Sequence, residues 1–403
     1  MLKKMEESLP LTLPNSRVAV FGERVKDART LRGVTAKRLA EELGKTPSSI
    51  SHLEGTESTE LPVAEVRLIA DFLGVDEEYL ITPPVSYIKN SDLHFRANST
   101  ITKKECSSQL SFLKIINEYI VQMVNTRKVE LFPVQLENLD YLDDMDNAVL
   151  RAREILRLKP GEPIGNLVSL LEKNGVIVVP TVGDLVAHIP NHDAYSSWTS
   201  GAGIDVPVIA VRMDTAWERQ RLSVAHELGH LLLHRYRAGE NKEEEAFDFA
   251  IRFLIPSVEI MKEWPDHATP LSLLPLKRKW GVSIAAIARY GRTLGLIDNF
   301  RYSSIYRQLS NNKDRATGKS WRVQEPGALE RLPEKPRVLA AIVSAVFGLL
   351  PSAEVLRSET FLPWDVLRPV FQQLDSPWAD ALGDDLVAGF QADIVSLDSR
   401  RVY

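Results

Sequence analysis

The sequence predicts a mostly helical α+β protein, and three patterns along the chain support this fold class. Residues 17–82 form a series of short helical segments separated by compact turns. Two runs rich in β-branched residues, at 176–179 and 206–212, predict the strands of a small sheet. Helical patterns at 106–173 and 276–300, followed by a C-terminal helical appendage, predict that most of the remaining chain is helical.

Composition limits the class of protein. At 403 residues the chain has room for two or three domains, and its 44% hydrophobic and 26% charged residues are ordinary for a soluble globular protein. The net charge of −5 argues against a protein that coats nucleic acid, although it allows a local basic surface. Cys106 is the single cysteine, which excludes an intrachain disulfide and favours a reducing, cytoplasmic location. Residues 1–16 have no apolar core of signal-peptide length, and the apolar stretch 338–350 is too short to span a bilayer. We therefore expect no signal peptide and no membrane contact, and we expect 338–350 to form a buried helix.

Residues 35–55 contain the pattern of two helices joined by a tight turn. Thr35 can cap the first helix, whose leucines point inward. Gly44 supplies the turn, and Pro47 stands at the first position of the second helix, where proline is tolerated. This pattern is typical of a helix-turn-helix, so residues 17–82 are predicted to form a five-helix DNA-binding domain.

The outward side chains of this helix pair predict contacts to operator DNA. Small hydroxyl groups and an imidazole can approach base edges in the major groove, and lysine or arginine can hold phosphates. The predicted DNA-contacting residues are Thr35, Lys37, Arg38, Lys45, Thr46, Ser48, Ser49, Ser51 and His52. Residues 17–55 have eight Lys or Arg and five Asp or Glu, and this local charge of +3 agrees with DNA binding. A helical interaction domain that does not touch DNA is the alternative, because the outer face lacks Arg, Gln or Asn for bidentate base contacts.

A polar stretch over 83–105, which starts with two prolines, predicts a linker because neither proline can continue a helix. The second domain is then expected over 106–300, and residues 301–403 form a C-terminal region without an assigned role. The strand predicted at 206–212 directly precedes a leucine-rich helix. This strand is expected to have a free edge, to which an extended peptide could add as a further strand.

The leucine-rich helix contains His226-Glu227-x-x-His230. Positions i and i+4 of an α-helix lie on one face, so both imidazoles can reach one metal ion. Glu227 then lies beside the ion, where its carboxylate can take a proton from the attacking water. Gly229 is expected to leave room near the metal face. The pattern predicts a zinc site with Glu227 as the catalytic residue, and a buried helix with two hydrogen-bonded histidines is the alternative.

A catalytic zinc ion of this kind needs a third protein ligand. Glu243, Glu244 and Glu245 follow in a helix that Asn241 is expected to cap, with Glu244 closing a capping box. Glu243 is the predicted ligand, because it shares a helix face with an alanine that allows a close approach to the histidine helix. Glu245, and after it Glu244, are the other candidates, since an acidic first turn also complements the helix dipole.

Three further residues near the motif are candidates for supporting roles. His234 continues the i, i+4 series but lies too far from His226 for one ion to reach both. We expect it to support the site or to complement the helix dipole. Tyr195 and Tyr236 are candidates for stabilising an oxyanion, on the basis of proximity in sequence alone. Tyr236 also stands where metzincins have a third histidine, which favours the zincins with a carboxylate ligand.

With both motifs in this order, the chain resembles the XRE-type regulators that carry an ImmA/IrrE-type metallopeptidase domain. The similar segments are residues 29–80, 221–234, 243–256, 276–284 and 321–326, so that the resemblance covers residues 20–330.

The resemblance implies a zincin-like domain with Zn²⁺ on His226, His230 and Glu243, and Glu227 as the general base. Two residues depart from the family pattern. Phe247 stands where the family usually has Asn or another polar residue, and Ala36 replaces an early Gln or Ser of the first DNA-binding helix. The first departure weakens the support of the metal site, and the second removes one expected phosphate contact.

These observations lead to three hypotheses. The leading one is a cytoplasmic transcriptional regulator that binds its operator as a homodimer and carries a zinc-dependent endopeptidase. By the resemblance, the substrate is a regulatory protein such as a repressor, or this chain itself. The second is a transcription factor whose metal domain is a non-catalytic sensor or structural module. The third is an antitoxin-like protein that binds a partner.

Overall fold

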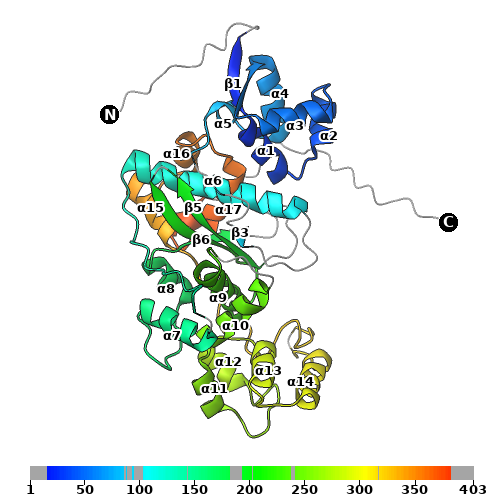
Figure 1. Ribbon diagram of the computed structural model, residues 1–403, viewed down its shortest axis with the longest axis vertical. Helices are drawn as coiled ribbons and strands as arrows, with labels where there is room; N and C mark the ends of the chain where they lie inside the picture. Colours follow the sequence, from blue (N-terminus) through cyan, green and yellow to red (C-terminus); the bar gives the residue numbers. More distant parts are fainter. Residues whose placement is uncertain are drawn as a thin grey trace, which may run out of the picture.

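The computed structural model describes residues 16–85, 88, 93–94, 103–142, 144–181, 193–201, 203–236, 241–315 and 317–382. Over these residues the chain forms eighteen helices and two small sheets, so the predicted fold class is confirmed. The molecule is elongated, with the N-terminal domain at one end and α11 to α14 at the other (Figure 1). None of the described helices is long and apolar enough to cross a membrane.

The N-terminal domain packs five short helices against a two-stranded antiparallel sheet. Its elements are β1 (Arg17–Phe21), α1 (Gly22–Leu31), α2 (Ala36–Glu42), α3 (Pro47–Gly55), β2 (Ser58–Pro62), α4 (Val63–Leu73) and α5 (Glu77–Ile81). The sequence predicted the helices but not the sheet, in which Arg17 pairs with Pro62 and Phe21 with Ser58. Three helices separate the two strands, so their pairing leaves no local sequence pattern.

Two hydroxyl groups cap the helices of the predicted turn. The Thr35 side chain accepts a hydrogen bond from the backbone N–H of Arg38 (3.1 Å), and that of Thr46 accepts one from the N–H of Ser49 (3.2 Å). Gly44 lies between α2 and α3 with φ of +63°, which glycine adopts without steric strain. The sequence-based prediction of this helix-turn-helix geometry is therefore confirmed.

The second sheet has four strands in the order β3-β5-β6-β4. They are β3 (Leu93–His94), β4 (Ile177–Thr181), β5 (Ala194–Gly201) and β6 (Ile204–Arg212), with β4 parallel to β6 and the other pairs antiparallel. Both predicted strands are present, but the prediction of a free edge on the second one is wrong. The reason is that β6 lies inside the sheet between β5 and β4, and β3 from the expected linker pairs with the outer edge of β5.

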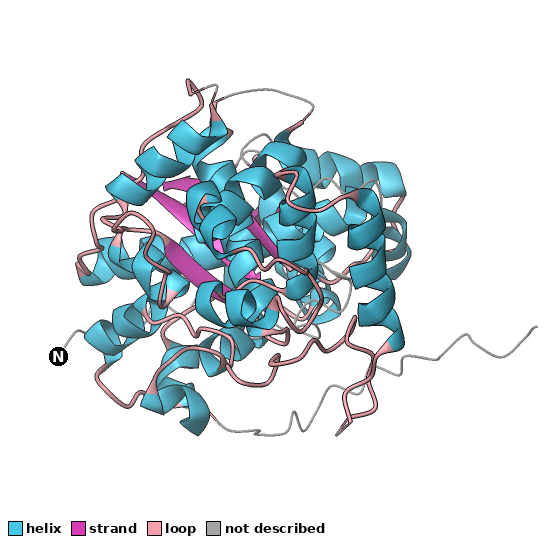
Figure 2. Ribbon diagram, turned by 90° about the horizontal axis from the view of Figure 1, so that it is seen from below, coloured by secondary structure: helices cyan, strands magenta, loops and turns pink. Residues whose placement is uncertain are grey.

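Helices cover both faces of this sheet, as Figure 2 shows. Along the strands, Val178 and Ile209 pack into one helical layer, whereas their neighbours Ile177 and Val208 pack into the other. Successive side chains of a strand point to opposite faces, so this sheet is buried on both sides.

The first layer contains the metal-motif helix. It comprises α7 (Met145–Ile155), α8 (Leu167–Lys173), α9 (Trp217–Leu233) and α10 (Lys242–Leu254), and its core continues into α11 (Ser257–Glu263), α12 (Leu274–Trp280), α13 (Ile284–Thr293) and α14 (Asn299–Asn311). The second layer comprises α6 (Lys103–Arg127), α15 (Val338–Phe347), α16 (Ala353–Ser358), α17 (Trp364–Gln372) and α18 (Pro377–Ala381). The described part of the C-terminal region contains the predicted helices, and α15 to α18 belong to the second layer.

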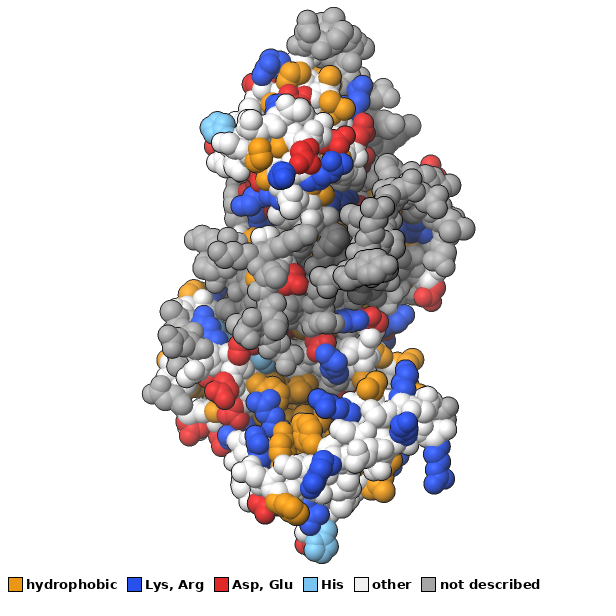
Figure 3. Space-filling model, turned by 90° about the vertical axis from the view of Figure 1, so that its right-hand side faces the viewer, with side chains coloured by type: hydrophobic (Ala, Val, Ile, Leu, Met, Phe, Trp, Pro, Cys, Tyr) orange, Lys and Arg blue, Asp and Glu red, His pale blue; other side chains and the backbone are white. Residues whose placement is uncertain are grey.

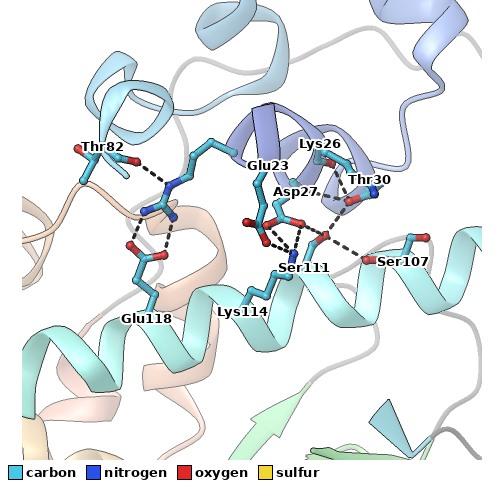
Figure 4. Close-up of polar contacts among 10 residues, drawn as sticks. Glu23, Lys26, Asp27, Thr30, Thr82, Ser107, Ser111, Lys114 and Glu118 are labelled. Carbon is cyan, nitrogen blue, oxygen red and sulfur yellow. Dashed lines mark hydrogen bonds and ion pairs between the residues drawn. The ribbon is translucent and has the colours of Figure 1, made fainter. Parts of the chain in front are cut away.

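A polar cluster joins the N-terminal domain to α6 (Figure 4). Arg24 on α1 forms a bidentate ion pair with Glu118 on α6, and both side chains are buried. Nearby, Lys114 of α6 pairs with Glu23 and Asp27 of α1. The N-terminal domain is therefore held on the helix that covers the sheet.

Candidate metal centre and nucleic-acid interface

Helix α9 carries the metal motif through the protein interior. His226, Glu227 and His230 are all buried, and the leucines of the same helix pack into the core of the first layer. Gly229 plays a different part from the one expected. A Cβ atom there would lie 3.0 Å from the Phe249 ring and 3.3 Å from the backbone of Ala246, so the glycine makes room for α10 and not for a metal.

The three predicted ligands lie together. His226 Nε2 is 3.1 Å from His230 Nε2, and each of these nitrogens is 3.3 Å from a carboxylate oxygen of Glu243. Ligand atoms around a tetrahedral zinc ion with bonds of about 2.0–2.1 Å are about 3.3 Å apart. The residues present therefore fit a zinc ion in both donor chemistry and spacing, and they form the group of potential metal ligands found among the described residues.

A hydrogen-bonded chain behind His230 fixes which of its ring nitrogens faces the other ligands. A carboxylate only accepts, so His234 donates from Nε2 to Glu245 Oε2 (3.0 Å). Nδ1 of a neutral His234 is then an acceptor, and His230 donates to it from Nδ1 (2.9 Å). This leaves the lone pair of His230 Nε2 directed at the metal position. The expectation that His234 supports the site agrees with this geometry, and Glu245 completes the chain.

Burial keeps His230 in the form that binds metal. Removal from water, together with the neighbouring imidazoles, lowers the pKa of His230 to about 4. The ring is therefore neutral at pH 7, as a metal ligand must be.

The proposed base, Glu227, faces a cleft next to the histidines. The Ser196 hydroxyl of β5 donates a hydrogen bond to Glu227 Oε2 (2.7 Å), which holds the carboxylate in position. The cleft has a volume of about 230 Å³, and His226, Glu227, Leu222 and Phe247 are among the residues that line it. Sequence reasoning missed Ser196, because nothing in the spacing of the two residues indicates that β5 lies over α9.

Two expectations around α10 and β5 are wrong. The Asn241 side chain does not cap α10, because its backbone (φ −100°, ψ 16°) is not extended as a capping residue requires. Glu244 is exposed and closes no capping box. Tyr195 cannot stabilise an oxyanion at this site, because its side chain packs into the second layer, on the sheet face away from α9. Tyr236, the other tyrosine considered for stabilising an oxyanion, is 71% exposed to solvent.

The predicted DNA-reading residues form the outer face of the helix-turn-helix. Ser48, Ser49, Ser51 and His52 are all exposed on α3. Two of these hydroxyls also bond locally, since Ser51 donates to the Pro47 carbonyl (3.1 Å) and Ser49 shares a hydrogen bond with the capping hydroxyl of α3 (2.8 Å).

The predicted phosphate-binding cations all have carboxylate neighbours. Lys37 lies 4.0 Å from Glu41, Arg38 lies 3.5–3.6 Å from Glu41 and Glu42, and Lys45 pairs with Glu65. Lys37 and Arg38 are more than half exposed, and exposed ion pairs of this kind are weak, so both cations remain able to contact phosphate. Thr35 and Thr46 use their hydroxyls to cap α2 and α3, which gives them a structural role beside any DNA contact.

Comparison with protein-family models finds matches to two parts of the chain. Residues 22–84 match the model of a helix-turn-helix domain, and residues 189–290 match the IrrE N-terminal-like domain of the M78 peptidases. No curated protein matches the chain.

The protein therefore combines a DNA-binding type of domain with a metallopeptidase-like domain. The two matches correspond to the XRE-like helix-turn-helix domain and the ImmA/IrrE-type domain that the sequence resemblance implied.

Proposed function

We propose that this protein is a cytoplasmic transcriptional regulator whose second domain is a zinc endopeptidase that cleaves a regulatory protein, such as a repressor. The observation that carries the proposal is the convergence of three predicted ligands: the Nε2 atoms of His226 and His230 lie 3.1 Å apart, and each lies 3.3 Å from a different carboxylate oxygen of Glu243. Glu227 lies on the same buried helix and faces the adjoining cleft. This is the arrangement that metal-assisted hydrolysis requires.

Each residue of the site has a part in the proposed reaction. Zinc, when bound by the two histidines and Glu243, supplies the Lewis acidity that lowers the pKa of water and polarises a peptide carbonyl. Glu227 accepts the proton of the attacking water and later donates it to the nitrogen of the leaving amine. Ser196 orients Glu227 through its hydrogen bond, and His234 holds His230 in the tautomer whose Nε2 lone pair can bind the metal.

The N-terminal domain supplies operator binding in this proposal. Its exposed α3 would enter the major groove, with Ser48, Ser49, Ser51 and His52 at base edges and Lys37, Arg38 and Lys45 at phosphates. A homodimer would bind two half-sites, as is usual for helix-turn-helix proteins.

The substitution Glu227→Gln tests the peptidase assignment. It removes the proton acceptor and leaves the three ligands in place, so the variant should keep its zinc and lose cleavage of the regulatory protein. Glu244→Gln is the matched control, because it makes the same chemical change at an exposed residue next to the third ligand. It should cleave like the unmodified protein. Unchanged proteolysis by Glu227→Gln would contradict the assignment, and zinc-dependent operator binding without any peptide product would favour a non-catalytic sensor.

A further inference from the structure

The metal cleft continues onto a surface that combines aromatic rings with arginine. Phe247, on α10, lines the cleft beside His226 and Glu227. The guanidinium carbon of Arg289, on α13, lies 4.0 Å from the centre of the Phe247 ring. The guanidinium of Arg292 covers the ring of Tyr302 on α14 in the same way, at 4.2 Å. Both arginines are exposed to solvent, and Arg289 lies beside the cleft through its contact with Phe247.

This part of the chain has an excess of positive charge. Residues 289–322 contain eight Lys or Arg and two Asp or Glu, a net charge of +6 in a protein whose total is −5. The two acidic residues already accept backbone hydrogen bonds, Asp298 from the N–H of Arg301 (2.7 Å) and Asp314 from that of Thr317 (2.8 Å). Within the described part of the chain, none of the eight cations forms an ion pair. Their charge is therefore available to a partner.

The cations of 289–322 differ from those of the neighbouring helix α12, which do form ion pairs. On α12, Arg278 pairs with Glu330 and Lys279 pairs with Glu263, both at 2.5 Å. In Figure 3, Lys and Arg side chains border a hydrophobic patch in the lower half of the molecule, where α13 and α14 lie in Figure 1.

The geometry favours carboxylates over nucleic-acid bases as the partner groups. Bases bind such surfaces by stacking on aromatic rings. Here guanidinium groups cover Phe247 and Tyr302, and Tyr302 packs against Tyr306 with ring centres 4.7 Å apart. A guanidinium that rests on an aromatic ring is held in orientation, and its free edge matches a carboxylate in two hydrogen bonds.

We propose that the cleft binds an acidic protein segment, in which an apolar side chain contacts the part of Phe247 that lines the cleft and an Asp or Glu within one or two residues of it pairs with Arg289. This inference rests on the proposed function, since it names the substrate class of the same cleft. Leu222 is another apolar residue that lines the cleft. The remaining cations of 289–322 attract further acidic residues of the segment, mainly by raising the rate of encounter.

Binding of two labelled peptides to full-length Glu227→Gln protein tests the proposal without any need for turnover. Both peptides contain the same leucine, which is flanked by aspartates in one and by asparagines in the other, and fluorescence anisotropy measures their dissociation constants. The aspartate peptide should bind about tenfold more tightly in low salt, and Arg289→Ala in the same background should remove most of that preference. Arg278→Ala is the matched control and should retain it, because that arginine is already paired.

Reversing the charge of Arg289 provides a second test, in which the sign of the peptide preference changes and not only its size. Arg289→Glu should invert the preference, so that a peptide with lysines in place of the aspartates binds better. Equal binding of the aspartate and asparagine peptides would overturn the proposal, and so would tighter binding of a single-stranded oligonucleotide that the aspartate peptide cannot displace. Failure of the unmodified protein to cleave any peptide would count against the peptidase assignment alone, because the preference is measured in an inactive variant.

Discussion

Replacing Glu118 by leucine would leave the Arg24 guanidinium buried at the domain contact without its carboxylate partner. Both side chains are 3% exposed. Arg24 also donates to the backbone carbonyls of Thr82 (3.0 Å) and Pro83 (3.1 Å), so the guanidinium is held in place from three sides. Loss of one member of a buried ion pair destabilises a protein by about 3–5 kcal/mol, because the remaining charge cannot be solvated. We expect Glu118→Leu to lower the free energy of unfolding by that amount.

The double variant Arg24→Met with Glu118→Leu separates the ion pair from general disruption of the contact. Two apolar side chains of similar size replace a buried ion pair at little cost, so the double variant should recover most of the stability that Glu118→Leu loses. Urea denaturation followed by circular dichroism measures both values. A single variant within about 1 kcal/mol of the unmodified protein, or a double variant no better than the single one, would refute the reasoning.

Three further predictions concern other parts of the molecule. Burial raises the pKa of Glu172 to about 7 while its carboxylate accepts hydrogen bonds from backbone amides at the start of α15. Between pH 4.5 and 7 the folded protein therefore binds more protons than the unfolded chain does. Its free energy of unfolding, measured with urea, should fall by about 3 kcal/mol from pH 4.5 to pH 8. Glu172→Gln should abolish this pH dependence. His234→Ala should weaken zinc binding by about 10–100-fold in competition with a chromophoric chelator, and an unchanged affinity would exclude its support of the site. Thr46→Ala should lower the stability of the N-terminal domain by about 1 kcal/mol through loss of the α3 cap, whereas Ser48→Ala, exposed on the same helix, should stay within about 0.5 kcal/mol.

The parts of the site that the sequence predicted are those fixed by local geometry. The i, i+4 spacing of His226 and His230 sets their common face on any helix, and the strands and the helix-turn-helix likewise follow from periodicity and turn residues. Glu243 was the preferred third ligand, and the structure brings its carboxylate within 3.3 Å of both imidazoles.

The missed features depend on contacts between segments that are far apart in the chain. Ser196 reaches Glu227 across 31 positions, and Arg24 reaches Glu118 across 94. Pairing of β3 with β5 likewise joins the expected linker to a strand more than 100 residues later, and no local pattern indicates such a register. The prediction that Asn241 caps α10 failed for a different reason. Asparagine is a suitable residue type for a cap, but the backbone of Asn241 is not extended.

X-ray absorption spectroscopy at the zinc edge, combined with metal analysis of the purified protein, tests the central claim most directly. The account predicts about one zinc ion per chain, bound by two imidazole nitrogens and one carboxylate oxygen. The same spectrum is expected from Glu227→Gln, and a loss of the carboxylate ligand with weaker retention of zinc from Glu243→Gln. A protein that binds no zinc, or a spectrum that Glu243→Gln leaves unchanged, would contradict the assignment of the metal centre.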